Sequence, residues 1–235
     1  MTLRRADPPL NWDEIRLVAF DVDGTLYDQR GLRLCMLREM LLAAMRSRSV
    51  GFIRILRAYR RIREQLGESL QEDFERELTM RTAVLVGCSI DQVQSTAEEW
   101  LEQRPLRHLI RYRYPGLPEL FERLRGHGKK IGIFSDYPAR HKLAALQLDA
   151  DVIVSADYDD VKVLKPHSRG LHILMSRAAV SPAETVLIGD RPERDGLAAR
   201  VANVRALILS RRPISDWQTF ARYDDPLFSA SGLFE

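Results

Sequence analysis

The amino-acid sequence predicts an α/β fold, with a parallel five-stranded sheet and an all-helical segment inserted after the first strand. Five short apolar runs predict the strands, at residues 15–21, 129–136, 151–156, 185–190 and 204–210. These runs are continuous rather than alternating, which is typical of parallel strands covered on both faces. Helical patterns lie between the runs, and the long stretch between the first two is helical throughout.

Each core element follows from a local pattern. The first run, "IRLVAFD", is short and apolar and ends at a turn signal. The later runs have the same character: "KKIGIFSD", "DVIVSA", "TVLIGD" and "VRALILS". The helical patterns beside them cover residues 117–126, 138–148, 168–179 and 194–202. In open sheets of this kind, ligands bind at the carboxyl ends of the strands.

The inserted segment divides the chain into two predicted domains. Residues 1–28 and 114–235 form the α/β core, and residues 29–113 form a helical domain. Four helices are expected in it, at about 32–48, 52–66, 69–86 and 90–103; the second has one apolar face made of Phe52, Ile55, Leu56, Tyr59, Ile62 and Leu66. The sequence "YPGLP" marks the return to the core. Residues 211–235 are expected to pack on the core as a tail.

Composition narrows the class of protein. The 235 residues are 45% apolar, enough to bury a sizeable core. Two cysteines, Cys35 and Cys88, make neither a disulfide framework nor a metal cluster, so a reducing compartment and a cytoplasmic location are expected. The first residues lack the apolar stretch of a signal peptide. No apolar run is long enough to predict a transmembrane helix.

Charge is unevenly distributed. The net charge is +3, yet residues 30–63 contain ten arginines and one acid, Glu39. The chain has 31 arginines and five lysines, so a general compositional bias explains part of this excess. The basic stretch leaves two interpretations open: arginines that draw an anionic substrate into a cleft, or a surface that contacts an anionic membrane. No clear nucleic-acid site is predicted.

Acidic residues follow two of the predicted strands. Asp21 and Asp23 are two residues apart after the first strand, which starts them on the same side, and Gly24 lets the backbone turn away. Asp190 ends the fourth strand, and Asp195 follows five residues later. If these two strands are neighbours, the carboxylates converge and repel one another unless a cation lies between them. A divalent ion with oxygen ligands, such as Mg²⁺, fits such a site.

Three further residues suggest phosphate chemistry. The second strand ends in Ser135-Asp136, where a hydroxyl and free amides can hold a phosphate oxygen. Lys165, in "VLKP", adds a cation. Carboxylates, a metal ion, a hydroxyl and a lysine together make a phosphoryl-transfer site.

Four motifs together resemble the haloacid dehalogenase superfamily, specifically its phosphatases. They are "DVDGTLYD", "IFSD", "LKP" and "GDRPERD", in the family's order. The resemblance covers roughly residues 15–28 and 114–210. It implies a Rossmann-like core, and the helical insert resembles the family's cap domain. The second aspartate of the first motif, Asp23, argues for phosphate chemistry, because the true dehalogenases of the family lack it.

The resemblance also implies roles for the two leading aspartates. Asp21 attacks phosphorus and forms an aspartyl-phosphate. Asp23 protonates the leaving alcohol and then activates water. Asp21 binds Mg²⁺ through its carboxylate, and Asp23 binds it through its backbone carbonyl.

The remaining motif residues complete the implied site. Asp190 is the acidic metal ligand, direct or through water, and Asp195 supports it. Ser135 holds a phosphoryl oxygen, and Lys165 offsets the charge of nucleophile and phosphate. Asp136 departs from the family's usual Asn. Because a carboxylate would repel phosphate, we expect its side chain to point away, capping the helix near Pro138 or pairing with Arg140.

Three functions are compatible with these patterns. The first is an Mg²⁺-dependent phosphatase acting on a small phosphorylated substrate. The second is a phosphomutase, which shares the core site and would need a cap that excludes water. The third is a binding module that uses the basic helices to hold an acidic partner or a membrane surface. The sequence leaves the substrate and the oligomeric state open.

Overall fold

The computed structural model describes residues 10–69 and 72–228. Its centre is one sheet in the order β3-β2-β1-β4-β5-β6, with every neighbouring pair parallel. The strands are β1 (Leu17–Phe20), β2 (Lys130–Ser135), β3 (Val152–Ser155), β4 (Thr185–Gly189), β5 (Arg205–Leu209) and β6 (Gln218–Phe220). The first five lie within the five predicted runs, which confirms the α/β class.

The sixth strand corrects the predicted number of five. β6 lies in the segment expected to be a tail, and it pairs with β5 through Leu207↔Gln218 and Leu209↔Phe220. Only one of its three residues is apolar, and only Phe220 is buried. An edge strand this short and polar gives no continuous apolar run, so its sequence carries little strand signal.

The register places β1 at the centre of the site edge. Phe20 lies opposite Ile133 of β2 and Ile188 of β4, so the three strands end within two residues of one another, at the same edge of the sheet. The four residues of β1 have no solvent exposure. Side chains of alternate residues enter different cores, because successive side chains of a strand point to opposite faces: Val18 and Phe20 join one cluster and Leu17 and Ala19 join the other.

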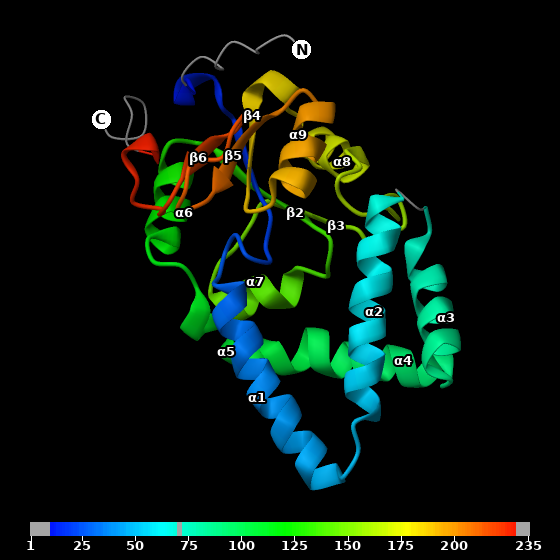
Figure 1. Ribbon diagram of the computed structural model, residues 1–235. Helices are drawn as coiled ribbons and strands as arrows, with labels where there is room; N and C mark the ends of the chain where they lie inside the picture. Colours follow the sequence, from blue (N-terminus) through cyan, green and yellow to red (C-terminus); the bar gives the residue numbers. More distant parts are fainter. Residues whose placement is uncertain (1–9, 70–71, 229–235) are drawn as a thin grey trace.

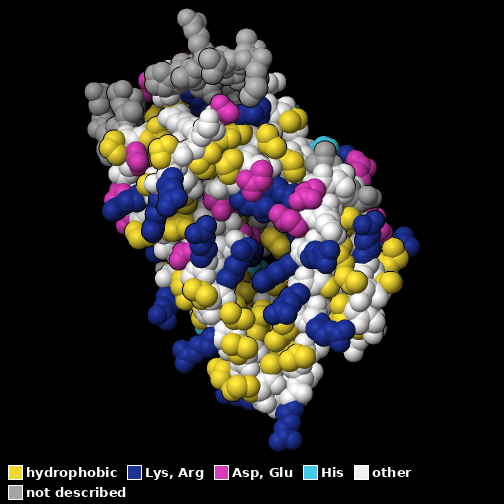
Figure 2. All heavy atoms as spheres, in the orientation of Figure 1, with side chains coloured by type: hydrophobic (Ala, Val, Ile, Leu, Met, Phe, Trp, Pro, Cys, Tyr) yellow, Lys and Arg dark blue, Asp and Glu magenta, His cyan; other side chains and the backbone are white. Residues whose placement is uncertain are grey.

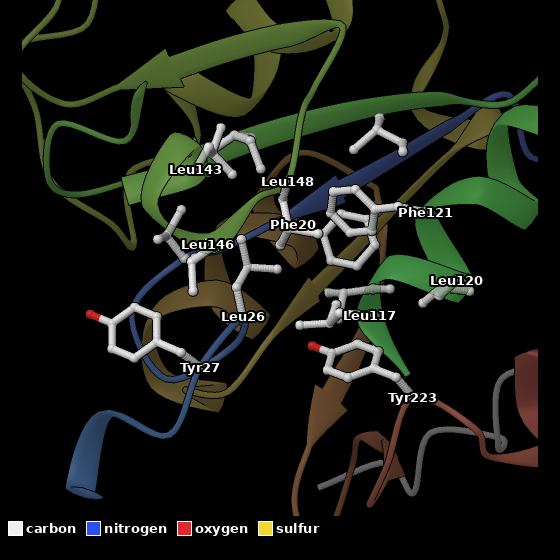
Figure 3. Packing of buried hydrophobic residues seen from close by; sticks show 14 of the residues in the cluster. Phe20, Leu26, Tyr27, Leu117, Leu120, Phe121, Leu143, Leu146, Leu148 and Tyr223 are labelled. Atoms are coloured by element: carbon white, nitrogen blue, oxygen red, sulfur yellow. The ribbon is translucent and has the colours of Figure 1, made fainter. Parts of the chain in front are cut away.

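Helices cover both faces of the sheet (Figure 1). On one face, α6 (Leu117–Gly126) and α7 (Arg140–Leu146) pack on the cluster that contains Phe20. On the other face lie α8 (Arg169–Ala178) and α9 (Leu197–Val201). Figure 3 shows the first cluster, where the rings of Phe20 and Phe121 lie 4.9 Å apart between centroids.

The insert between β1 and β2 is helical throughout its described residues. Its helices are α1 (Gln29–Ser47), α2 (Gly51–Glu68), α3 (Phe74–Val86), α4 (Ile90–Ala97) and α5 (Arg104–Tyr112), with a π-helical turn at Glu98–Gln103. The prediction of four helices missed α5. Pro105 stands in the first turn of α5, where the chain changes from the π-helical turn to an α-helix, and the helical segment continues through it. None of the described helices is long and apolar enough to cross a membrane.

The two chain segments that join insert and core lie side by side. The backbone N–H of Asp28 donates to the carbonyl of Tyr112 (2.8 Å), and the backbone N–H of Tyr114 donates to the carbonyl of Leu26 (3.1 Å). The Asp28 side chain also accepts from the backbone N–H groups of Arg30 and Gly31, which caps α1. The helices therefore leave and rejoin the core at one place, beside the carboxyl end of β1.

Both cysteines are free thiols. The reducing compartment and the cytoplasmic location stay predictions.

Candidate active site

Three aspartates meet at the carboxyl edge of the sheet. Asp21 follows β1, Asp190 follows β4, and the two strands are neighbours. Asp195 comes from the π-helical turn Pro192–Gly196 after β4. One oxygen of each carboxylate lies within 4.8 Å of the others, and Asp21 and Asp195 are 6% and 1% exposed. The structure thus brings together the three side chains that the sequence placed at a metal site.

The Asp-Gly-Thr turn fits closely around these carboxylates. Gly24 has φ +99°, and a Cβ there would come within 2.3 Å of Asp190 Oδ2. Thr25 Oγ1 donates to Asp21 Oδ2 (3.0 Å), and the Thr25 carbonyl accepts from the hydroxyl of Tyr223 (2.6 Å). Both the backbone conformation and the lack of space therefore require glycine at position 24.

Lys165 is the cation buried among these acids. Its Nζ donates to Asp21 Oδ1, to Asp195 Oδ1 (2.6 Å) and to the Phe134 carbonyl (3.2 Å), and the residue is 3% exposed. Burial by itself would lower the pKa of Lys165, but the charges of Asp195 and Asp21 raise it above its ordinary value. Lys165 therefore stays protonated and offsets one of the three carboxylate charges.

The remaining charge gives the site its affinity for a cation. Burial raises the pKa of Asp21 well above its ordinary range, with Lys165 opposing and the neighbouring aspartates adding to the rise. Burial and the charge of Asp195 raise the pKa of Asp190 to about 7. A divalent ion bound by these oxygens would restore the ionised state of both groups.

Asp23 has a separate set of partners. Lys142, from α7, donates to both of its carboxylate oxygens (2.6 Å each), and the Tyr27 hydroxyl donates to Oδ1. Burial would raise the pKa of Asp23, but Lys142 and Tyr27 outweigh it and lower the pKa below its ordinary value. Neither Lys142 nor Tyr27 was predicted as a site residue. The scarcity of lysine is a weak signal for Lys142, whereas its contact with Asp23 depends on the tertiary packing of α7.

The turn after β2 differs from the expectation for Asp136. Its Oδ1 accepts the backbone N–H of Lys165 (2.8 Å), and it neither caps α7 nor pairs with Arg140. The side chain thus fixes the backbone of the lysine that holds Asp21. Ser135 has no solvent exposure, and its Oγ accepts the backbone N–H of Tyr137 (3.1 Å). Its predicted contact with a phosphoryl oxygen stays a prediction.

Helix α2 reaches over this turn. Arg63 is 7% exposed, donates to the Asp136 carbonyl, and stacks on Tyr137 with its guanidinium carbon 4.0 Å from the ring centroid. Arg194 of the core donates to the Glu64 carbonyl of α2 (3.1 Å) and to the Lys165 carbonyl. The insert is therefore tied to the turn that carries Asp136 and to the loop that carries Arg194 and Asp195.

A large cleft opens between insert and sheet above these residues. Its volume is about 1830 Å³, and Asp21, Asp23, Lys165, Asp190 and Asp195 all line it. Arginines from α1 and α2 form much of its wall, and Figure 2 shows basic side chains gathered around the hollow. Most ligand pockets measure about 300–1,000 Å³, so this cleft has room for a substrate as well as solvent.

The fold and the site define an α/β protein with a carboxylate cluster at the sheet's carboxyl edge and a helical insert over it. A family model described as haloacid dehalogenase-like hydrolase matches residues 15–203. The chain belongs to this family of hydrolases, as the four motifs predicted.

Individual relatives agree with the family. A phosphoglycolate phosphatase of Vibrio vulnificus is 27% identical over 195 residues, which cover 80% of this chain and 81% of the relative. Phosphoglycolate phosphatase 1 of Pseudomonas aeruginosa is 25% identical, over 86% and 73% of the two chains.

Solved structures share the fold. A 2-haloacid dehalogenase from Pseudomonas syringae has a TM-score of 0.62 and 19% identity, covering 89% of this chain and 95% of that one. The putative HAD-hydrolase YfnB of Bacillus subtilis, bound to magnesium, has a TM-score of 0.62 and 16% identity, over 88% and 95% of the chains.

Because the pKa of Asp190 is raised, the free energy of unfolding of the metal-free protein should fall as pH rises. Since its folded pKa of about 7 exceeds the unfolded value, the folded state binds the extra proton at low pH and loses that stability as pH rises through 7. Asp190→Asn mimics the protonated acid. The advantage of the variant over the wild type should be small near pH 4, grow as pH rises toward 7, and reach about 1–4 kcal/mol near pH 8.5, in chelator, by denaturant unfolding. Asp149→Asn, which alters an exposed carboxylate, is the control; an Asp190→Asn advantage independent of pH would contradict the assignment.

The Lys142–Asp23 pair predicts strong energetic coupling. Lys142→Met leaves the carboxylate of Asp23 in a site where both side chains are at least 85% buried, and should cost about 3 kcal/mol in the free energy of unfolding. Adding Asp23→Asn should recover part of this loss, because no unpaired charge then remains. A double-mutant cycle by urea unfolding measures the coupling, and strictly additive effects would show that the pair does not interact.

Proposed function

We propose that this hydrolase is an Mg²⁺-dependent phosphatase that cleaves a small phosphomonoester through an aspartyl-phosphate. The observation that carries the proposal is the carboxylate of Asp21. It lies at the base of a basic cleft, is bound by Lys165 and Thr25, and has two further carboxylates beside it. This arrangement suits a nucleophile that must stay ionised next to an anionic phosphoryl group.

Asp21 is held in one orientation. Lys165 takes Oδ1 and Thr25 takes Oδ2, and both partners are buried. Attack on phosphorus transfers the phosphoryl group to a carboxylate oxygen and releases the alcohol. Lys165 then offsets the charge that the acyl phosphate brings to the site.

Asp23 is the proposed acid and base. Lys142 and Tyr27 fix its carboxylate on the cleft wall and keep it ionised, which suits the step in which it accepts a proton from attacking water. The earlier step, protonation of the leaving oxygen, needs a protonated Asp23. We therefore expect the Lys142 contact to loosen when substrate occupies the cleft.

The residues present fit a magnesium ion. The carboxylates of Asp21, Asp190 and Asp195 and the backbone carbonyl of Asp23 would hold it, and the three side chains lie close enough to share one ion. A bound Mg²⁺ supplies positive charge that draws phosphate oxygens toward the nucleophile. The magnesium-bound structure of the related fold supports this choice of ion.

The substrate is proposed from the relatives and the cleft. Two relatives are named phosphoglycolate phosphatase, so phosphoglycolate is the first compound to examine. A phosphomutase shares the same core site, and a solved neighbour, from Thermotoga maritima, is titled putative β-phosphoglucomutase. Release of inorganic phosphate separates the two activities. The complete carboxylate and lysine set argues against a purely non-catalytic binding module.

Phosphate release tests the proposal. The wild type should liberate inorganic phosphate from a panel of phosphomonoesters with Mg²⁺ present, and should lose activity in chelator. Asp21→Asn should fold normally and reduce turnover by about 10³-fold or more, because the nucleophile is lost.

A second readout does not depend on turnover. Mg²⁺ should raise the melting temperature of the wild type at pH 8, since an ion that binds only the folded state stabilises it. Asp190→Asn should weaken that response, and Asp149→Asn should retain it. Full activity after exhaustive chelation would rule out the metal, and normal turnover by folded Asp21→Asn would rule out the mechanism.

A further inference from the structure

The arginines of the insert fall into two groups according to their place along α1 and α2. Both helices run between the core and a distant turn at residues 48–50 (Figure 1). Near the core, five of them line the cleft: Arg30, Arg33, Arg60, Arg61 and Arg63. Toward the turn, five others lie outside the cleft lining: Arg38, Arg46, Arg48, Arg54 and Arg57.

Four of the cleft arginines, Arg30, Arg33, Arg60 and Arg61, have no carboxylate partner within the described residues. Other basic residues of the cleft are occupied: Lys142 by Asp23, Arg191 by Glu64, and Arg63 by the Asp136 carbonyl. By contrast, neither an ion pair nor a side-chain hydrogen bond joins Arg30, Arg33, Arg60 or Arg61 to any described residue. The cleft wall therefore carries positive charge that the protein itself leaves uncompensated.

Arg33 of α1 and Arg60 of α2 line the same cleft as Tyr27 and Asp23. Partial desolvation lowers the pKa of Arg60, and the charge of Arg33 lowers it further, while Tyr137 and Tyr27 oppose the change. Tyr27 is the residue that donates to Asp23. Two like charges from separate helices thus belong to one cleft lining, which Asp23 shares, and a bound anion would relieve their repulsion.

We infer that Arg33 and Arg60 form a second anion subsite that binds a carboxylate or phosphate on the leaving-group part of the substrate. This inference rests on the proposed phosphatase function for its orientation. It adds that the preferred substrate carries two anionic groups. Guanidinium groups suit the task because their paired N–H donors match carboxylate and phosphate oxygens. Arg30 and Arg61 border the subsite and contribute to its potential.

Three esters of similar size test the subsite. Glycerol 3-phosphate has a neutral far end, 3-phosphoglycerate has a carboxylate, and 1,3-propanediol bisphosphate has a second phosphate. The wild type should hydrolyse one or both anionic esters with kcat/KM about tenfold or more above that for glycerol 3-phosphate. The double variant Arg33→Gln/Arg60→Gln should lose most of this preference, mainly through KM. Arg54→Gln, two turns away on α2 and outside the cleft lining, should keep it.

Binding measurements test the anion subsite independently of the hydrolysis reaction. The same esters are titrated calorimetrically into Asp21→Asn with Mg²⁺, with and without the two arginine changes. Arginine-dependent binding of an anionic ester, without hydrolysis by the wild type, would overturn the phosphatase proposal and support the subsite. Hydrolysis and binding that do not distinguish the three esters, or a preference that survives the double variant, would overturn the subsite.

The outer arginines accompany a separate feature, an exposed apolar stripe. Six large apolar side chains of α1 and the following turn are exposed: Leu34, Leu37, Leu41, Leu42, Met45 and Val50. Leu34 and Met45 are each 70% exposed. The single acid of residues 30–63, Glu39, is engaged by Arg107 and His108. Figure 2 shows apolar and basic side chains together at this end of the molecule.

We propose that the α1–α2 hairpin rests on an anionic lipid surface. Large apolar side chains flanked by arginines favour an anionic membrane interface, where the apolar groups leave water and the guanidinium groups meet headgroups. A second copy of the chain is a poorer partner, since a symmetric contact would bring two such basic patches together. The orientation would leave the core on the aqueous side of the contact.

Vesicle sedimentation tests this contact. The full chain should bind vesicles of phosphatidylglycerol and phosphatidylcholine, bind pure phosphatidylcholine weakly, and lose binding as salt rises. Leu41→Ser/Met45→Ser and Arg46→Gln/Arg48→Gln should each reduce binding about tenfold or more, because they remove apolar contact and charge respectively. Val84→Ser, an equally drastic change at an exposed site on α3, should leave binding intact. Absence of vesicle binding, or a dimer by light scattering that Leu41→Ser/Met45→Ser disrupts, would overturn the proposal.

Discussion

The site depends on one electrostatic constraint, the crowding of three carboxylates around the ammonium of Lys165. Asp21 and Asp195 share this ammonium, and Asp190 lies beside them without it. Repulsion among these carboxylates lowers the stability of the folded protein, and the packing of the core must offset this loss. The surrounding structure therefore has to hold the side chains rigidly. The rigidity is visible in Gly24, whose backbone approaches Asp190 closely, and in Asp136, which fixes the backbone of Lys165. The residual negative charge is the reason that we propose a cation site at this edge of the sheet.

The helical insert adds a second electrostatic layer of opposite sign. It joins the core through two chain segments that are hydrogen-bonded to each other, Leu26–Asp28 and Tyr112–Tyr114. From there α2 returns to the site, where Arg63 contacts the turn that carries Asp136 and Glu64 contacts the loop that carries Arg194. An anionic substrate would therefore enter between a basic wall and an acidic floor. That separation of charge would orient the proposed phosphomonoester before any chemistry takes place.

Much of the core could be predicted from the sequence, because its signals are local. The strands are continuous apolar runs, and Asp21 and Asp190 follow them directly, so neighbouring strands were enough to bring these acids together. The sixth strand was missed because Gln218 and Thr219 give no apolar run. Helix α5 was missed because the last predicted helix ends at residue 103, and Pro105, a residue type that often ends a helix, follows closely. These errors concern elements whose stability comes from packing rather than from their own composition.

The partners of the site residues were harder to predict, since they depend on tertiary contacts. Lys142 lies on a short helix 119 positions from Asp23, and nothing in its neighbourhood distinguishes it from a surface lysine. Asp136 was expected to turn toward its own helix, yet the backbone of Lys165 offers a donor across the site. In both cases the side chain contacts a group that the fold of the sheet brings near. Local sequence patterns do not encode such a contact.

The arginine-rich segment shows the same limit on a larger scale. Its composition is nearly uniform along residues 30–63, so sequence alone gave one basic stretch with two competing explanations. The α1–α2 hairpin separates them in space: residues near its base face the cleft, whereas those near its turn face solvent beside exposed leucines. At 1.5 Å per residue, a helix of 18 residues spans about 27 Å, which is far enough for its two ends to meet different partners. One charge pattern can therefore serve substrate capture at one end and surface contact at the other, and only the fold assigns each arginine to its place.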